Sequence, residues 1–376
     1  MKQQKLWMWI AAAGGASVAL GLALSPRSAF ASILTAGYWL LCLGLFGIFF
    51  VAVQYASGAS WAVAFRRVPE AMTSALPIGS AILAVAFVFA SELYPWVHEQ
   101  EHFAGFKKAW LNVPFFLARA AIILMLWWFF ARRIVKGSRR QDITRDPGIT
   151  GGVTRLSVGF LVIFAITFSL ASFDWIMSLE PHWYSTIFAM YNFAGMFSSG
   201  LAALILLLVW QRRTSPLRDF VNEEHFHDLG KLLFGFTTFW MYIWFSQYML
   251  IWYANITEES VYYIQRTQRY WAPLFILNVI LNWIFPFLAL LPKRVKRTPH
   301  LLARVAAVVV IGRWLDLYLM IQPASGAASP SLSVWAIGAP AAAASLFVVS
   351  FLRALKEAEP VPVGDPRLAE SLHYHN

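Results

Sequence analysis

Long apolar runs alternate with short polar stretches along almost the whole chain. Each run contains about 18 to 25 residues, which as a helix is long enough to cross the roughly 30 Å hydrocarbon layer of a bilayer. The pattern predicts ten membrane-spanning helices. They are Leu6–Leu24, Ile33–Tyr55, Ala71–Phe89, Val113–Phe130, Val158–Leu179, Ile187–Leu208, Leu229–Tyr253, Leu274–Leu291, Leu301–Met320 and Leu332–Phe351.

The composition agrees with this pattern. Hydrophobic residues make up 59% of the 376 residues and charged residues only 13%, about half the charged fraction of a soluble globular protein. The polar connections run to about 25 residues at most, so we expect one all-α integral membrane domain over residues 1–376. Cys42 is the single cysteine, which excludes an internal disulfide and a thiolate-bound metal cluster.

The formal net charge of +11 follows the predicted topology. Of the 30 lysines and arginines, 23 lie on the side of the N-terminus, five on the other side and two within spans. Positive residues collect in cytoplasmic loops of membrane proteins, so both termini are expected in the cytoplasm. The charge therefore does not point to a nucleic-acid partner.

A faint internal repeat divides the predicted spans. Residues 113–119 (Val-Pro-Phe-Phe-Leu-Ala-Arg) open the fourth span, and residues 272–278 (Ala-Pro-Leu-Phe-Ile-Leu-Asn) open the eighth. The fifth and ninth spans carry Asp174 and Asp316 towards their outer ends. The repeat predicts two tandem four-helix bundles of the same orientation, residues 33–179 and 187–320, with the first and last spans flanking them.

Several polar side chains fall within the outer half of the membrane or at its boundary. Such groups are costly in lipid unless they are paired or face a polar cavity. Arg313 and Asp316 lie three residues apart on one helix face and can neutralise each other. Each group alone could be a structural contact between helices, whereas the cluster favours a polar pocket reached from outside. The candidates are Glu92, Arg119, Asp174, Gln247, Tyr248, Arg313 and Asp316.

The connection after Asp174 concentrates further polar groups at the same surface. Pro181 is typical of the first turn of a helix, and Glu180 would suit the positive end of that helix. His182 titrates near neutral pH and could accept a proton that leaves the membrane, although a lone interfacial histidine can equally be a hydrogen-bond partner.

A second polar group opens the seventh span on the cytoplasmic side. His225, His227 and Asp228 could ligate a metal, but no further ligands follow at useful spacing. We expect instead that Asp228 caps the helix and that Lys231 extends towards the interface. His227, Asp228 and Lys231 are also candidates for proton uptake. No haem-binding pattern is present, so no metal is assigned to this chain.

Three segments of the sequence resemble a known family. Residues 172–186 (Ser-Phe-Asp-Trp-Ile-Met-Ser-Leu-Glu-Pro-His-Trp-Tyr-Ser-Thr), 227–233 and 245–255 are similar to the NrfD-like membrane subunits of alternative complex III, particularly the second large one. That complex is a bacterial quinol:cytochrome c oxidoreductase. The resemblance extends from about the second span to the ninth and implies a location in the bacterial inner membrane.

The resemblance also implies partners and cofactors. The partners would be a sister NrfD-like subunit, an iron–sulfur protein, multihaem and monohaem cytochromes c, surrounding membrane lipid and a terminal oxidase. Haem c and the iron–sulfur clusters would belong to partners, and a quinone, either ubiquinone or menaquinone, could bind this chain. In the family the sister subunit is thought to hold the functional quinol site.

The leading hypothesis is a subunit of such a complex with a polar pocket near the outer face. The pocket would bind a quinone head group or carry protons, with Asp174 as the acid and His182 as the outward relay. Arg119, Arg313 and Asp316 would complete it. The alternatives are a purely structural scaffold of the complex and a proton channel or secondary transporter that acts alone.

Overall fold

The structure is a computed structural model that describes residues 2–327 and 329–374. These residues form helices joined by short connections, and no strand occurs among them. Nine helical segments in the described part of the chain are long and apolar enough to cross a membrane. The chain is therefore an all-α, multi-pass membrane protein.

The long helices follow the predicted apolar runs. They are α1 (Lys2–Leu24), α2 (Pro26–Ala56), α3 (Arg67–Met72) with α4 (Ala75–Val88), α7 (Val113–Thr144), α8 (Gly148–Ala171), α9 (Phe188–Thr214), α10 (Glu223–Ala254), α12 (Ala272–Val279) with α13 (Phe285–Leu290), α15 (Pro299–Ile321) and α16 (Val334–Leu355). Shorter helices lie in the connections: α5 (Ala90–Leu93), α6 (Gly105–Trp110), α11 (Thr257–Thr267), α14 (Lys293–Arg297) and α17 (Leu368–Leu372).

The predicted seventh span lies in α10, which is not among the nine apolar helices. With 32 residues it is long enough to span a bilayer, but its many tryptophans and tyrosines make it less apolar by composition. The total of ten spans therefore stays a prediction. The fourth span was predicted to end at Phe130, whereas α7 continues to Thr144 as a polar, basic extension.

Two of the long helices contain a π-helical turn. One follows α8 at Ser172–Ile176, and the other joins α12 to α13 at Ile280–Ile284. A π turn inserts one residue into the helical repeat and rotates the side chains that follow, and such turns are frequent at functional sites. The first turn carries Asp174 and the second carries Asn282, both of which are buried.

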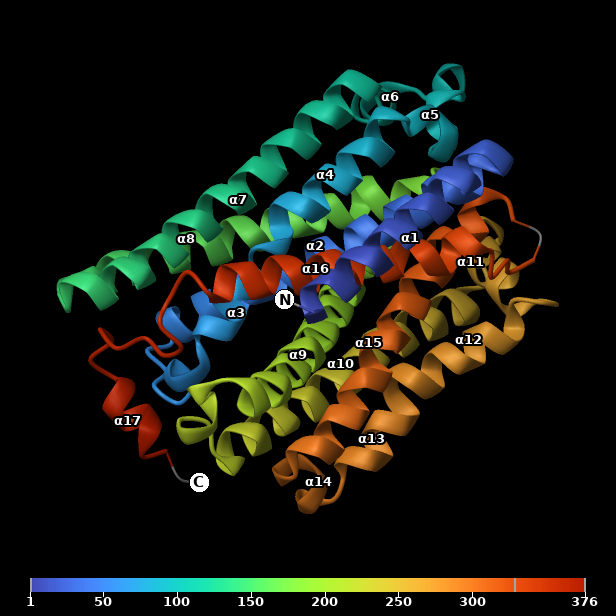
Figure 1. Cartoon of the computed structure of the whole chain (residues 1–376). Helices are drawn as coiled ribbons and strands as arrows, with labels where there is room; N and C mark the ends of the chain where they lie inside the picture. The colour runs from blue at the N-terminus through green and yellow to red at the C-terminus, as the bar shows by residue number, and fades with distance from the viewer. Residues whose placement is uncertain (1, 328, 375–376) are drawn as a thin grey trace.

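Helix α2 lies at the centre of the molecule and is buried over most of its length. It packs against α4, α8, α9, α15 and α16, while α7 packs on α8, and α9 packs on α10 and α15 (Figure 1). Helix α1 lies mainly against α16 and is otherwise largely exposed. These contacts connect helices within each predicted bundle and also across them. A division into two bundles stays a prediction.

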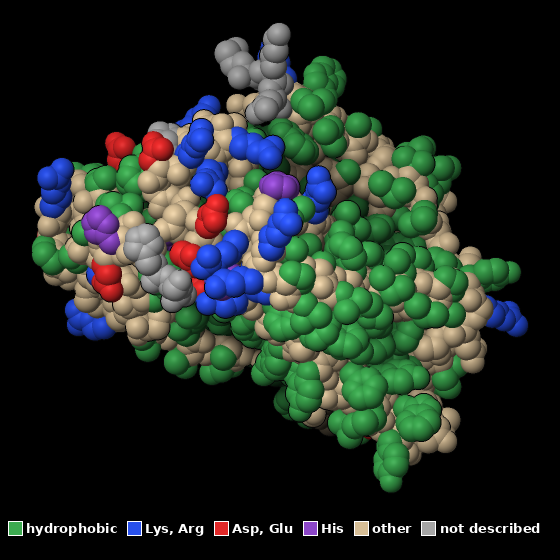
Figure 2. Space-filling model, turned by 90° about the horizontal axis from the view of Figure 1, so that it is seen from below, with side chains coloured by type: hydrophobic (Ala, Val, Ile, Leu, Met, Phe, Trp, Pro, Cys, Tyr) green, Lys and Arg blue, Asp and Glu red, His purple; other side chains and the backbone are tan. Residues whose placement is uncertain are grey.

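The two ends of the helix bundle differ in charge. Helices α3, α14 and α17 lie at one end, and α5, α6 and α11 lie at the other (Figure 1). Lysines and arginines gather over the first end, whereas hydrophobic side chains cover the adjoining flank (Figure 2). We refer to the end with α3, α14 and α17 as the basic end, and to the end with α5, α6 and α11 as the opposite end.

Close contact between α2 and α9 depends on Gly200. A Cβ atom at this position would overlap the inner part of the Phe46 side chain on α2, which is fully buried. We therefore predict that Gly200→Ala destabilises the protein by about 1–3 kcal/mol, the usual effect of adding volume to a packed core. The measurement is the midpoint of thermal unfolding of the purified protein in detergent.

Gly235→Ala on α10 is the matched control, because no atom lies within 4 Å of its added methyl group. It should leave the midpoint unchanged or raise it, since alanine is the better helix former. Equal midpoints for the two variants would show that α2 and α9 do not meet as described.

Candidate functional site

Asp316 on α15 is the centre of a buried polar network. Only 1% of the residue is exposed, and its carboxylate forms an ion pair with Arg313 one turn earlier on the same helix. The Tyr191 hydroxyl on α9 donates to Oδ1, as does Asn278 Nδ2 on α12 at 3.0 Å. Trp240 Nε1 on α10 donates to Oδ2 at 3.3 Å. Four helices thus supply donors to one carboxylate, which makes its burial possible.

Asp174 has a simpler set of partners in the other half of the chain. Arg119 Nε on α7 donates to its Oδ2 at 2.8 Å, and Trp110 Nε1 on α6 donates to its Oδ1 at 2.7 Å. The Arg119 guanidinium also lies over the rings of Trp110 and Phe115, at 4.0 and 4.3 Å from their centroids. This buried ion pair is well packed, with both carboxylate oxygens occupied.

The internal repeat relates these two sites. Arg119 and Asn278 occupy the seventh position of the two matched segments, and each donates a hydrogen bond to the aspartate of its own half. The halves differ in the source of positive charge. Arg119 reaches Asp174 from a neighbouring helix, whereas Arg313 lies on the same helix as Asp316.

A small polar cavity of about 10 Å³ borders Asp316. Its lining includes Tyr191, Gln247 and Arg266, and its volume matches the space that one water molecule needs. Arg266 Nη2 donates to Glu180 Oε1 at 2.6 Å, and Gln247 accepts a bond from Ser185 at 3.0 Å. Polar groups thus continue from the cavity to the connection between residues 179 and 188.

Polar groups also lie between the two halves. Arg313 Nη2 donates to Asn192 Oδ1 at 3.0 Å, and Arg313 lies beside the Cys42 thiol on α2. Tyr38, one turn before Cys42, lies beside Ser172 at the start of the π turn that carries Asp174. Cys42 itself is fully buried, and its surroundings are partly polar.

The connection after Asp174 differs from its predicted form. Helix α9 begins only at Phe188, so Pro181 is not in its first turn and Glu180 does not cap it. Glu180 instead pairs with Arg266, because the α11 helix brings that guanidinium over the connection. His182 is 70% exposed in its side chain and contacts Glu99 at 3.0 Å rather than Asp174.

The remaining candidate residues of the outer half, Gln247, Tyr248 and Glu92, lie in different surroundings in the fold. Gln247 is buried and its Nε2 donates to the Tyr263 hydroxyl at 2.9 Å. Tyr248 is half-buried and stacks on Trp244 with 5.8 Å between ring centroids. Glu92 on α5 is exposed to the surroundings and lies outside the network.

The start of α10 also differs from the prediction. Asn222 caps this helix by accepting bonds from the backbone N–H groups of Glu224 and His225, so the expected cap at Asp228 is wrong. Asp228 lies one turn inside the helix, where it pairs with Lys231 and accepts a bond from Tyr374.

His227, the third candidate for proton uptake, lies 3.8 Å from Glu224. Among the described residues, no group of three His, Cys, Asp or Glu side chains is arranged to hold a metal.

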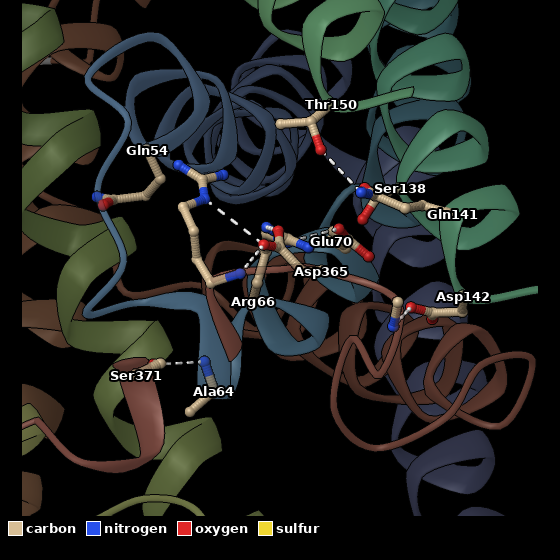
Figure 3. Close-up of polar contacts among 12 residues, drawn as sticks. Gln54, Ala64, Arg66, Glu70, Ser138, Gln141, Asp142, Thr150, Asp365 and Ser371 are labelled. Carbon is tan, nitrogen blue, oxygen red and sulfur yellow. Dashed lines mark hydrogen bonds and ion pairs between the residues drawn. The ribbon is translucent and has the colours of Figure 1, made fainter. Parts of the chain in front are cut away.

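A cluster of buried charges at the basic end was not predicted. Arg66 pairs with Asp365 at 2.6 Å and lies 3.5 Å from Glu70, as Figure 3 shows. Arg67 bridges Glu70 and Asp142. Hydropathy alone places the two arginines among the basic residues of a cytoplasmic connection, because Asp142 and Asp365 lie 75 and 299 positions away along the chain.

The C-terminal segment, residues 357–374, closes over this cluster. The Gly364 N–H donates to Asp142 at 3.0 Å, and the Ser371 hydroxyl accepts a bond from the Ala64 N–H at 2.9 Å (Figure 3). Further along, Tyr374 reaches Asp228 on α10. The segment therefore ties α7 and the turn before α3 to the start of α10.

Burial by itself would raise the pKa of Asp365. The guanidinium of Arg66 and a hydrogen bond from the backbone of Arg367 outweigh burial and hold this pKa below its ordinary value. A carboxyl group with a lowered pKa stabilises the folded state above its unfolded pKa of about 3.9, and this contribution is lost as the pH falls through the folded value.

No protein-family model matches the chain, and no curated protein sequence matches it. The chemistry of the site therefore rests on its geometry. A buried carboxylate beside space for one water can exchange a proton with that water. The same space is too small for the ring of a quinone.

We predict that Asp365→Asn releases the C-terminal segment, because Arg66 then loses its closest acid. Loss of one partner from a buried ion pair costs about 3–5 kcal/mol, enough to speed cleavage at Arg367 by more than about tenfold. Trypsin digestion at pH 8, followed by mass spectrometry, measures this rate.

Glu359→Gln is the control, because Glu359 is an exposed acid in the same segment. In the wild-type protein, protection of the segment should persist from pH 8 to pH 5, as trypsin digestion can show, and be lost as the pH falls below about 4, as pepsin digestion can show. Equal cleavage of both variants at Arg367 would contradict the role of Asp365.

Proposed function

We propose that this chain is a proton-conducting membrane subunit of a bacterial quinol:cytochrome c oxidoreductase of the alternative complex III type. The observation that carries this proposal is the water-sized cavity at Asp316, whose polar lining continues through Arg266 to Glu180. The basic end would face the cytoplasm, as the distribution of lysine and arginine favours, and the opposite end would face outward.

In this proposal Asp316 is the carboxylate that exchanges protons with a cavity water. Tyr191 and Asn278 hold its Oδ1, while Arg313 pairs with its Oδ2. In this proposal a cavity water carries the proton from Asp316 towards Glu180, and Arg266, which stays protonated, holds the Glu180 carboxylate beside the cavity. Glu180, which is 16% exposed in its side chain, would be the outer terminus of the path.

A quinone site in this chain has less support than proton conduction. A quinone head group needs a slot with a polar group at each carbonyl and an apolar passage for its tail. The cavity at Asp316 has room for about one water, and both oxygens of Asp174 are already bonded. Quinol oxidation would then belong to the sister NrfD-like subunit, next to the iron–sulfur partner, with cytochromes c receiving the electrons.

A purely structural role is the second candidate, and the Asp174 site favours it. Arg119 and Trp110 occupy the carboxylate there, and aromatic rings cover the guanidinium. Such a buried pair is strongly destabilising to break but need not take part in chemistry. The two candidates differ at Asp316, where a scaffold would not require a proton to move.

We predict that Asp316→Asn lowers quinol:cytochrome c turnover by at least about tenfold in membranes that contain the assembled complex. The amide keeps the shape of the side chain but cannot exchange a proton. Tyr191→Phe is a gentler second variant, because it removes one hydrogen bond without leaving Arg313 unpaired. It should lower turnover and shift its pH profile.

Glu92→Gln is the control for both variants, since Glu92 is an exposed acid outside the network. The amount of assembled complex is measured alongside turnover by native gel and haem absorbance. Normal turnover per assembled complex in Asp316→Asn would overturn proton conduction and favour the scaffold. Isolation of the chain alone, without haem absorbance, would contradict membership of the complex and favour a separate transporter or channel.

A further inference from the structure

A second, larger cavity lies near the basic end, away from the Asp316 network. It has a volume of about 440 Å³, is open to the surface and is bordered by α3 and α4, by α7 and by the end of α16. Its polar lining includes Ser74, Arg132, Lys136 and Arg139. The proposed proton path does not use this cavity, so it needs a separate explanation.

The cavity lies where α7 changes from apolar to basic. The predicted span of this helix ends at Phe130, and Trp128 lines the cavity together with Arg132 and Lys136. Tryptophan and basic side chains concentrate at the level of lipid head groups. The cavity is therefore placed where the head groups of the adjacent leaflet would lie.

The basic side chains of the cavity carry unused charge. Among the described residues, no acid lies within ion-pair distance of Arg132 or Lys136, both of which are exposed, and the Arg132 guanidinium lies over the Trp128 ring, 5.2 Å from its centroid. The two acids in the lining already have partners: Glu70 pairs with Arg67, and Glu357 pairs with Arg139 at 2.8 Å. The cavity is therefore complementary to an anion.

Two further polar groups of the lining have no partner in the protein. The Ser74 hydroxyl and Arg139 Nε are both buried and make no hydrogen bond within the described structure. Buried donors without partners are uncommon in folded proteins and indicate a ligand or water. Ser74 immediately precedes α4 and Arg139 lies on α7, so one bound group with several acceptor oxygens could satisfy both sides of the cavity.

Apolar side chains form the rest of the wall. Pro77, Ala131 and Val135 line the cavity beside the charged groups. A free inorganic anion would gain nothing from this apolar part, whereas a lipid places its glycerol and acyl chains against it. The cavity presents basic side chains and apolar side chains together at the expected level of the lipid head groups. This combination favours a lipid over a soluble anion as the ligand.

We propose that this cavity binds the phosphodiester head group of an anionic phospholipid. The phosphate lies between Arg132, Lys136 and the Ser74 hydroxyl, and the acyl chains run along Pro77 and Val135. The bound lipid fixes α4 and the polar extension of α7 beside the end of α16. This proposal is independent of the proton path.

The test uses the protein purified from membranes with its partners and transferred to nanodiscs of phosphatidylcholine with 20% phosphatidylglycerol, about one lipid in five. Native mass spectrometry then measures which lipids remain bound. We expect phosphatidylglycerol to be retained over phosphatidylcholine by the wild-type protein. The double variant Arg132→Gln/Lys136→Gln should lose this retention by at least about tenfold, since each basic residue contributes to anionic-lipid binding.

Arg133→Gln/Arg140→Gln is the matched control, because both arginines are exposed on the same helix and do not line the cavity. It changes the net charge equally and should keep the lipid. Equal loss in the two double variants would overturn the proposal in favour of diffuse surface charge. Displacement of the lipid by millimolar inorganic phosphate would overturn it in favour of a soluble anion. If the site is as described, Lys136→Gln alone lowers the retention of phosphatidylglycerol by less than the double variant does.

Discussion

The cost of burying carboxylates in an apolar helix bundle organises this protein. Asp174 and Asp316 are each almost completely buried, and an ionised carboxylate in such surroundings is stable only if cations and hydrogen-bond donors surround it. Each aspartate therefore fixes the helices that bring its donors. For Asp316 these are α9, α10 and α12, and for Asp174 they are α6 and α7.

The two halves meet this requirement with different chemistry. In the first half an arginine at the repeat position neutralises Asp174 directly, and aromatic rings leave little room around it. In the second half the repeat position holds the neutral Asn278, and a water-sized cavity remains beside Asp316. Such divergence is expected if one copy keeps a structural ion pair while the other carries protons, as proposed above.

The basic end depends on contacts between segments distant in the chain. The C-terminal segment inserts Asp365 beside Arg66, and its later residues reach α10. These bonds give the buried Arg66 and Arg67 acidic partners, and they tie the C-terminal segment to α7 and α10 at the basic end. In the neighbouring cavity Arg132 and Lys136 have no acidic partner, so this cavity is complementary to an anion, whereas each arginine of the cluster beside it is paired with acids.

The sequence by itself determined the helical, multi-pass architecture, because apolar runs of sufficient length specify membrane helices wherever they occur. It also matched Asp174 with Asp316, and position 119 with position 278, because the similarity between the two segments can be seen in the sequence without knowing which residues touch. Only the tertiary structure decided which of these groups meet. His182 and Glu92 remained at the surface, whereas Tyr191, Trp240 and Arg266 joined the networks, because hydrogen bonds between helices depend on their rotation and depth, which hydropathy does not encode.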